Sequence, residues 1–437
     1  MEYGVVFGGG GSRGSYEIGV WKALLEMGID IKAVAGTSVG ALNGAMLVQG
    51  DFETAYDIWV NLNIQNIVKL ENISLSEENR ISIKDFITYL RCLLKDGGLD
   101  ISPLRELLLK YIDEERIRKS KIDFGLVTFS LSDLKPVIVY KEQIPEGQLI
   151  DYLIASASLP VFKNQAIENK IFVDGGIYDN IPVSLIADKG IENIVVVDCS
   201  GIGRVRKIFF DGIKTIYIKN SRHLGGTLHF DSQIIKNNID LGYLDALKAF
   251  GKLTGKRFFF SVQNKNDFLT TPLTQNSIDM LFSMLDIKKM RLPSDIIANY
   301  RILRTIKGYV NGELNAGNIV LAALEITAEV FGIDSLNTYN PDELANLIFK
   351  EYCELKESKF LSNPLSNIKS LIPDKVSDLR SADAKYLACI GVGSDESINM
   401  ILYRKFLATT LPKICIANLF LSLMAVRMEE SENMPGS

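Results

Sequence analysis

The sequence predicts a three-layer α/β/α fold with a mainly parallel central sheet, followed by a mostly helical C-terminal region. The chain opens with two short apolar runs, residues 3–7 and 31–35, and each precedes a segment whose apolar residues keep helical spacing. Further β-rich runs alternate with helical segments as far as residue 218, as in parallel βαβ units. Beyond residue 231 the apolar spacing becomes largely helical.

Length and composition limit the organisation of the chain. With 437 residues, 47% of them apolar, the chain is too long for one small core, so we expect two domains. We place the first at residues 1–230 and the second, a mostly helical region of unknown role, at 231–437. The second contains no catalytic constellation that the sequence reveals.

Charge and cysteine content exclude some classes of function. The net charge of −5 gives no basic footprint for nucleic acid, and the short cluster at 204–207 is interpreted as a solvated loop. The five cysteines are scattered and lack C-x-x-C spacing. This pattern supports neither a disulfide framework nor a thiolate metal site, and it favours a reducing compartment.

Hydropathy bears on localisation. The N-terminus lacks the basic start and long apolar run of a signal peptide, and no apolar run reaches the roughly 20 residues that span a bilayer. We therefore expect a cytoplasmic or peripheral membrane protein. The most apolar helical segment, 414–426, is either buried in the C-terminal region or lies in a membrane interface, where it would help the protein to meet a membrane or a partner.

A glycine loop follows the first predicted strand, and a helix follows the loop. It contains Gly9, Gly10, Gly11, Ser12, Arg13 and Gly14. The glycine spacing fits a dinucleotide fingerprint, but the acid expected after the second strand is missing. A tight structural turn is a second interpretation. The favoured one is an oxyanion hole, since consecutive glycines can direct several backbone N–H groups at one point.

A serine stands between the second predicted strand and the helix after it. Ser38 lies in the sequence Gly36-Thr37-Ser38-Val39-Gly40, the G-x-S-x-G pattern of a nucleophile elbow. Gly36 and Gly40 suit such an elbow because the sharp turn leaves little room for side chains. In a parallel sheet both this turn and the glycine loop lie at the carboxyl ends of strands, where ligands bind.

The following segments extend the α/β pattern. Residues 51–119 are expected to be helical, with one apolar stripe from Ile83 to Leu94 and another helix that starts at Ser102-Pro103. Core packing is the favoured interpretation of most of their apolar residues, and a roof over the site with contacts to substrate is the alternative. The later elements are strands at 124–129 and 136–140, a helix at 148–157, and strands at 170–173, 194–197 and 213–218.

A serine nucleophile needs a base, and two kinds of residue compete for this role. His223 and His229, the two histidines of the chain, lie in a polar segment with glycines, where surface or packing roles are the favoured interpretation. Asp174 ends a predicted strand and is followed by Gly175 and Gly176. We expect its side chain to be exposed at the carboxyl end of that strand.

These three motifs together resemble the patatin-like phospholipases. The resemblance rests on the glycine loop, Gly36 to Gly40 and Asp174 to Gly176, which follow one another as in that family. It extends over roughly Met1 to Lys219, because residues 155–160 and 180–182 also resemble the family. It implies a patatin-like fold, a Ser38–Asp174 dyad without histidine, a glycine-loop oxyanion hole, and neither metal nor cofactor. Asp179 departs from the uncharged residue found in many members.

The resemblance also implies a function, hydrolysis of acyl esters of phospholipids or lysophospholipids. In the implied mechanism Asp174 accepts the proton of Ser38 and later activates water; Arg13 either steadies the loop or attracts a phosphate group. The alternative is a catalytically silent lipid-binding or scaffolding module that keeps the fold. Head-group and acyl-chain preference, and the need for a protein activator, stay open at this point.

Overall fold

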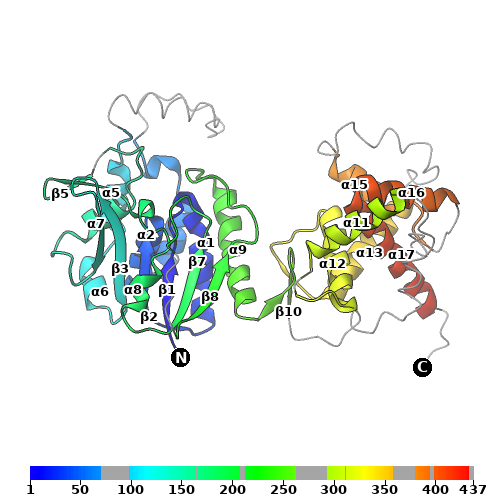
Figure 1. Ribbon diagram of the computed structural model, residues 1–437, viewed down its shortest axis with the longest axis horizontal. Helices are drawn as coiled ribbons and strands as arrows, with labels where there is room; N and C mark the ends of the chain where they lie inside the picture. The colour runs from blue at the N-terminus through cyan, green and yellow to red at the C-terminus, as the bar shows by residue number, and fades with distance from the viewer. Residues whose placement is uncertain are drawn as a thin grey trace. The chain divides into compact units, whose positions relative to one another are not determined.

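The computed structural model describes residues 1–69, 98–163, 165–206, 212–261, 293–310, 312–357, 379–393 and 398–432 (Figure 1). The chain forms two compact units, Met1–Phe250 and Gly251–Ser437. The apolar stripe expected from Ile83 to Leu94 lies outside the described residues.

Five strands of the first unit form a parallel sheet in the order β3-β2-β1-β7-β8. Their bounds are Glu2–Phe7 (β1), Asp30–Thr37 (β2), Asp123–Ser130 (β3), Asn193–Asp198 (β7) and Lys214–Lys219 (β8). The chain adds β2 and β3 on one side of β1 and β7 and β8 on the other. The strand order therefore reverses at β1, and the carboxyl ends of β1 and β2 adjoin the crevice where such sheets bind ligands.

An antiparallel extension completes the eight-stranded sheet. It consists of β4 (Lys135–Tyr140), β6 (Lys170–Asp174) and β5 (Gln165–Ile167). One edge of β3 pairs along its length with β4. The other edge pairs first with β2 and then with β6, which runs in the opposite direction. Strands β2 and β6 consequently meet end to end beside β3.

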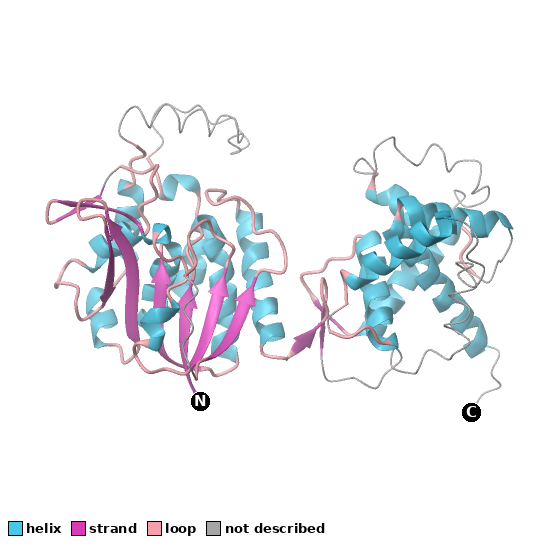
Figure 2. Ribbon diagram, viewed as in Figure 1, coloured by secondary structure: helices cyan, strands magenta, loops and turns pink. Residues whose placement is uncertain are grey.

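Helices cover both faces of this sheet (Figure 2), which confirms the predicted three-layer α/β/α class. The side chains of Ala33 and Ala35 pack with α8 (Val183–Ala187) in one apolar cluster. Val34 points to the other face, where it adjoins Gly44 of α2 (Val39–Gln49). This alternation is the two-residue period of a strand that is buried on both sides.

The remaining helices of the first unit lie around this framework. They are α1 (Ser15–Glu26), α3 (Phe52–Asn61), α5 (Ser102–Tyr111), α6 (Glu114–Lys119), α7 (Leu149–Ser156) and α9 (Ser232–Ala249), with short 3-10 turns at Gly11–Gly14, Ile64–Asn66 and Gly175–Ile177. Helix α5 begins at the predicted Ser102-Pro103, since proline suits the first turn of a helix.

The first unit extends past the boundary expected at residue 230. Helix α9 packs along α1: Tyr16 donates a hydrogen bond to Asp245 at 3.0 Å, and Asn238 donates one to Ser15 at 3.2 Å. All four side chains are buried. Because these contacts tie α9 to the sheet domain, the second compact unit begins at Gly251.

The second unit is mostly helical. Its helices are α11 (Pro293–Lys307), α12 (Ala316–Val330), α13 (Pro341–Glu357), α15 (Ser381–Cys389), α16 (Ile398–Thr410) and α17 (Pro412–Glu432), and its small sheet contains β9 (Leu253–Thr254), β10 (Phe259–Ser261) and β11 (Thr338–Tyr339). Part of the helical region expected beyond residue 231 lies outside the described residues.

The apolar segment 414–426 lies within α17, and of its two interpretations the structure supports burial in the C-terminal region over a membrane interface. From Ile414 to Met424 its side chains are buried in the core of the second unit, including the two polar ones, Asn418 and Ser422. Among the described residues no helix is long and apolar enough to cross a membrane. The polar face of this helix turns inward, where Asn418 accepts a hydrogen bond from Arg404 of α16 at 3.1 Å.

Candidate active site

Ser38 occupies the predicted sharp turn between β2 and α2. Its backbone has φ 57° and ψ −130°, a conformation that costs energy for a residue with a side chain. The neighbouring glycines permit this turn. A β-carbon at Gly36 would lie 2.2 Å from the carbonyl oxygen of Gly40, and one at Gly40 would lie 2.3 Å from that of Phe7.

A second serine holds the turn in place. The backbone N–H of Ser38 donates to Oγ of Ser156 at 2.9 Å, and that hydroxyl donates to the carbonyl of Val127 in β3 at 2.7 Å. The end of α7 is thereby tied to the elbow and to the sheet. Ser156 thus positions the turn at Ser38. In the sequence, its segment was noted only because residues 155–160 resemble the family.

Asp174 reaches Ser38 through the end-to-end meeting of β2 and β6. Thr37 is the register partner of Val127, and Asp174 is the partner of Thr128, the next residue of β3. The structure therefore brings together the two residues that the sequence selected. The expected exposure of Asp174 is wrong: its strand is antiparallel to β3, and Asp174 is only 6% exposed, as is Ser38.

The carboxylate of Asp174 is held on one side only. Oδ1 accepts a hydrogen bond from the N–H of Gly176 at 2.8 Å. Oδ2 is buried and lacks a partner at full hydrogen-bond geometry among the described residues, although the Ser38 hydroxyl is close enough to stabilise the charged form. Such loose contacts are common in active sites before substrate binds.

Burial controls the ionisation of this carboxyl group. Desolvation raises the pKa of Asp174 to about 6, against the opposing effect of hydrogen bonds from Ser38 and Gly176. A carboxylate with this pKa is ionised at neutral pH and is a stronger base than an exposed aspartate. The environment thus tunes the group toward proton acceptance.

The glycine loop lies beside Ser38, and only some of its N–H groups are occupied. The backbone of the loop is close to Ser38, because a β-carbon at Gly9 would lie 3.1 Å from Cβ of Ser38. The N–H of Gly9 donates to Asn180 at 3.1 Å, and that of Ser12 donates to Thr227 at 2.8 Å. The N–H groups of Gly10 and Gly11 donate to no acceptor in the described part of the chain.

Arg13 and Ser12 use their side chains to anchor the loop. Nε of Arg13 donates to the carbonyl of Gly225 at 3.0 Å, and its guanidinium also donates to the carbonyl of Ser200. The Ser12 hydroxyl donates to the carbonyl of Gly226 at 2.8 Å. Of the two roles considered for Arg13, these contacts support the loop-steadying one.

Residues 220–230 form a segment that the sequence did not assign to the site; we call it the strap. It supplies the carbonyl of Thr227 to the glycine loop, and Leu228 and Phe230 line the cavity beside Ser38. His223 and His229 of the strap are solvent-exposed, whereas Ser38 and Asp174 are buried. Two apolar side chains within a polar stretch were the available signal for this role.

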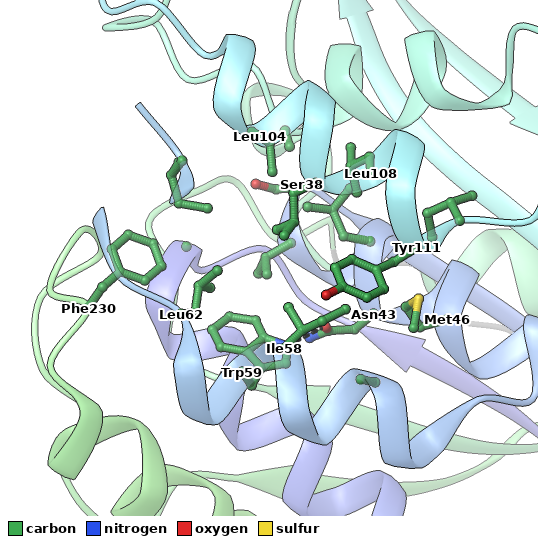
Figure 3. Close-up of a pocket in the computed structure, with 18 of the residues that line it drawn as sticks. Ser38, Asn43, Met46, Ile58, Trp59, Leu62, Leu104, Leu108, Tyr111 and Phe230 are labelled. Atoms are coloured by element: carbon green, nitrogen blue, oxygen red, sulfur yellow. Dashed lines mark hydrogen bonds between the residues drawn. The ribbon is translucent and has the colours of Figure 1, made fainter. Parts of the chain in front are cut away.

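An apolar cavity of about 110 Å³ adjoins Ser38 (Figure 3). Its walls come from α2, α3, α5 and the strap, so the roof considered as the alternative is formed in part by described helices. The side chains that line it include Leu42, Asn43, Met46, Ile58, Trp59, Leu62, Leu104, Leu107, Leu108, Tyr111, Leu228 and Phe230. Such a lining suits a hydrocarbon chain.

Asn43 is the polar member of this wall, and its hydrogen bonds are internal. Its amide donates to Glu17 at 2.8 Å and to the carbonyl of Gly14 at 3.0 Å, and it accepts from Nε1 of Trp59 at 2.9 Å. Asn43 thus joins the cavity wall to the end of the glycine loop.

No group of three or more His, Cys, Asp or Glu in the described ranges could hold a metal ion.

Comparison with known proteins finds a match to one family within the first unit. Residues 5–187 match the family described as patatin-like phospholipase. This match confirms the resemblance, and it lies within the range over which the sequence motifs suggested it. The glycine loop, Ser38 and Asp174 all fall inside the matched residues.

Curated relatives match the same part of the chain. A lysophospholipase nte1 of Aspergillus terreus is 28% identical over 204 residues, which are 46% of this chain and 12% of that protein. An uncharacterized NTE family protein of Mycobacterium tuberculosis is 25% identical over 198 residues, 45% of this chain and 49% of that one. The chain thus spans at most about half the length of these relatives.

Comparison with solved structures gives matches that cover nearly the whole chain. The crystal structure of VipD from Legionella pneumophila is 13% identical, with a TM-score of 0.39, and the comparison covers 95% of this chain and 91% of that one.

Proposed function

We propose that this chain, which carries a patatin-like phospholipase domain over residues 5–187, is a serine hydrolase that cleaves acyl esters of phospholipids or lysophospholipids. One observation carries the proposal: a strained serine lies between a half-satisfied buried carboxylate and an apolar cavity. Strain and unsatisfied buried groups persist where function requires them.

The first chemical step uses Ser38 and Asp174. As Oγ of Ser38 attacks the ester carbonyl, Oδ2 of Asp174 accepts the hydroxyl proton, because Oδ1 is already engaged with Gly176. The carbonyl oxygen becomes an oxyanion, and the free N–H groups of Gly10 and Gly11 are the donors available to it. Gly9, Ser12, Arg13 and Gly14 then have the role of shaping the loop.

The second step releases the acyl group. The protonated carboxyl of Asp174 gives its proton to the leaving alcohol, and an acyl ester of Ser38 remains. Asp174 then removes a proton from water, which attacks this ester; Asp174 returns that proton to Oγ of Ser38 as the fatty acid leaves, so the free serine and the ionised carboxylate are restored. The acyl chain occupies the apolar cavity, and the N-terminal end of α2 adds a favourable dipole at the reacting oxygen.

Labelling with a fluorophosphonate probe tests this proposal. The wild-type protein is expected to react and to hydrolyse a chromogenic medium-chain ester, whereas Ser38→Ala is expected to lose labelling and about four or more orders of magnitude in rate. Ser184→Ala, on α8 at the other face of the sheet, is the matched control and keeps both.

Two outcomes would contradict the proposal in different ways. Labelling that survives in Ser38→Ala would move the nucleophile, with Ser12 and Ser158 next to test, although both of these hydroxyls already donate to backbone carbonyls. Neither labelling nor turnover by folded wild-type protein, with membranes supplied, would favour the silent lipid-binding module.

A further inference from the structure

A loop with exposed apolar residues follows β7, and its described part contains Arg204 and Arg206 of the short basic cluster. Ile202 in this loop is 86% exposed, and Val205 is also exposed. Ile177, in the turn after Asp174, is exposed as well. We call these three side chains the apolar rim. Single exposed aliphatic side chains are common, but several on adjoining segments that also carry exposed cations are typical of a surface that binds a partner or a membrane.

Backbone contacts place this loop between the two halves of the candidate active site. The N–H of Arg204 donates to the carbonyl of Gly176 at 2.8 Å, and the carbonyl of Arg204 accepts from Asn180 at 2.7 Å. At the other end, a β-carbon at Gly201 would lie 1.8 Å from the carbonyl oxygen of Gly9. The loop therefore adjoins both the Asp174 turn and the glycine loop.

The exposed charge of this region is positive. Arg204 is exposed, and the guanidinium of Arg206 lies 4.6 Å from the ring centre of Tyr178. Asp179 is the one acidic residue in the sequence of these two segments, 175–180 and 200–206, and it is buried. Its carboxylate accepts hydrogen bonds from the backbone N–H groups of Arg206 and Ile181. The whole chain, by contrast, has a net charge of −5.

We propose that the apolar rim, with Arg204 and Arg206, docks this active site on the surface of an anionic phospholipid bilayer. The inference rests on the proposed function, since a lipid substrate must leave a membrane to reach Ser38. Aliphatic side chains enter the boundary between head groups and acyl chains, and arginines pair with phosphates there. The attachment of the loop to both halves of the site directs the substrate entrance toward the membrane.

Sedimentation with vesicles tests the docking without relying on catalysis. Protein that carries Ser38→Ala is mixed with vesicles of phosphatidylcholine alone or with 30% phosphatidylglycerol. We expect binding to the anionic vesicles to weaken about tenfold with Ile202→Ser and about fivefold with Arg204→Ser, as one aliphatic side chain and one cation contribute at such a surface. Thermal unfolding confirms that each variant is folded.

Matched controls lie at the opposite end of the sheet. Leu25, 51% exposed at the end of α1, and Lys121, exposed just before β3, both lie near the amino ends of the strands. Leu25→Ser and Lys121→Ser are expected to leave vesicle binding unchanged. Equal losses in these controls would show a general hydrophobic or charge effect and would overturn the assignment.

A gain of signal provides a second readout. Ile202→Trp is expected to shift its emission to shorter wavelength when anionic vesicles are added, whereas Leu25→Trp does not. The inference would be overturned if the protein did not bind vesicles, and this result would favour a protein partner for the rim. It would also be overturned if the Ile202→Ser/Arg204→Ser double variant still bound vesicles. A protein that binds vesicles through the rim but never hydrolyses esters would instead refute only the proposed function.

Discussion

Two buried polar groups, Asp174 in the first unit and Asn418 in the second, are satisfied to different degrees. In the first unit the carboxylate of Asp174 is buried with one oxygen lacking a full partner, and Ser38 beside it has a strained backbone. In the second unit Asn418 is completely buried and fully used: its amide donates to the carbonyls of Ala388 and Ile390 at 2.9 and 2.8 Å, and its oxygen accepts from Arg404 at 3.1 Å.

This difference separates the candidate active site from a structural network. Arg404 is also fully buried and donates to the carbonyl of Gly391 at 3.2 Å. Its contacts join α16 and α17 to the end of α15, so the network fixes how these helices pack. Satisfied polar networks specify a core, whereas a group left half-satisfied is free to bind or react. Asp174 and Asn418 should therefore respond to substitution in opposite ways.

Asp174→Asn is expected to show the largest effect, a fall of about three orders of magnitude in kcat/KM, because the amide cannot accept the serine proton. The thermal stability of the Asp174→Asn variant, by contrast, should increase. Since the folded-state pKa of about 6 lies above the usual 3.8, ionisation destabilises the folded protein as pH rises between these values. The amide removes this penalty, so Tm should rise by a few degrees at pH 8.

The same experiment includes the histidines as controls. His223→Ala and His229→Ala are expected to change the rate less than about threefold, since both side chains are solvent-exposed. Tryptophan fluorescence follows the unfolding of the first unit, because Trp21 and Trp59 are the two tryptophans of the chain. If a histidine substitution abolished turnover, a three-residue relay would replace the dyad.

Asn418→Leu tests the structural network in the second unit. The change keeps a similar volume but removes a partner of the buried Arg404 guanidinium, and we expect a loss of about 3 kcal/mol in the free energy of unfolding. Urea denaturation followed by far-UV circular dichroism reports this loss, and tryptophan fluorescence reports the first unit separately. Asn399→Leu, at an exposed position of α16, is the control and should stay within 0.5 kcal/mol or so of wild type.

The pH dependence of hydrolysis measures how far burial tunes the base. Because Asp174 must be ionised to accept a proton, kcat/KM for a soluble ester should be constant above about pH 6 and fall nearly tenfold per unit below it. Circular dichroism at each pH excludes unfolding as the cause. A rate that stays flat down to pH 4.5 would mean that Asp174 is not the base or that its carboxylate is better solvated.

Local motifs allowed the sequence to predict much of the site. The turn at Ser38 is indicated by Gly36 and Gly40, within two positions of it, and the βαβ order of the first unit follows from hydrophobic periodicity. The antiparallel course of β6 was not predictable, because it depends on pairing with β3, about forty residues away in sequence. The strap was missed for the same reason: Thr227 meets the glycine loop across more than two hundred residues.

Two placements that the sequence did not decide have a related cause. The sequence of α17 is apolar nearly all round, which suits either a membrane interface or a core, and the contacts that decide between these come from α15 and α16. Likewise, the helical spacing of α9 gave no sign that it packs on α1 in the first unit. Periodicity predicts that a face is buried, but not which partner buries it.

The smallest expected effect concerns the acyl chain. Leu107 of α5 lines the cavity beside Ser38 and is half-buried, so Leu107→Trp should fill part of the 110 Å³ space. We expect kcat/KM for a dodecanoyl ester to fall about tenfold relative to that for a butanoyl ester. Leu109→Trp, on the same helix but 59% exposed, should leave this ratio unchanged. An unchanged ratio in Leu107→Trp as well would place the acyl chain outside this cavity.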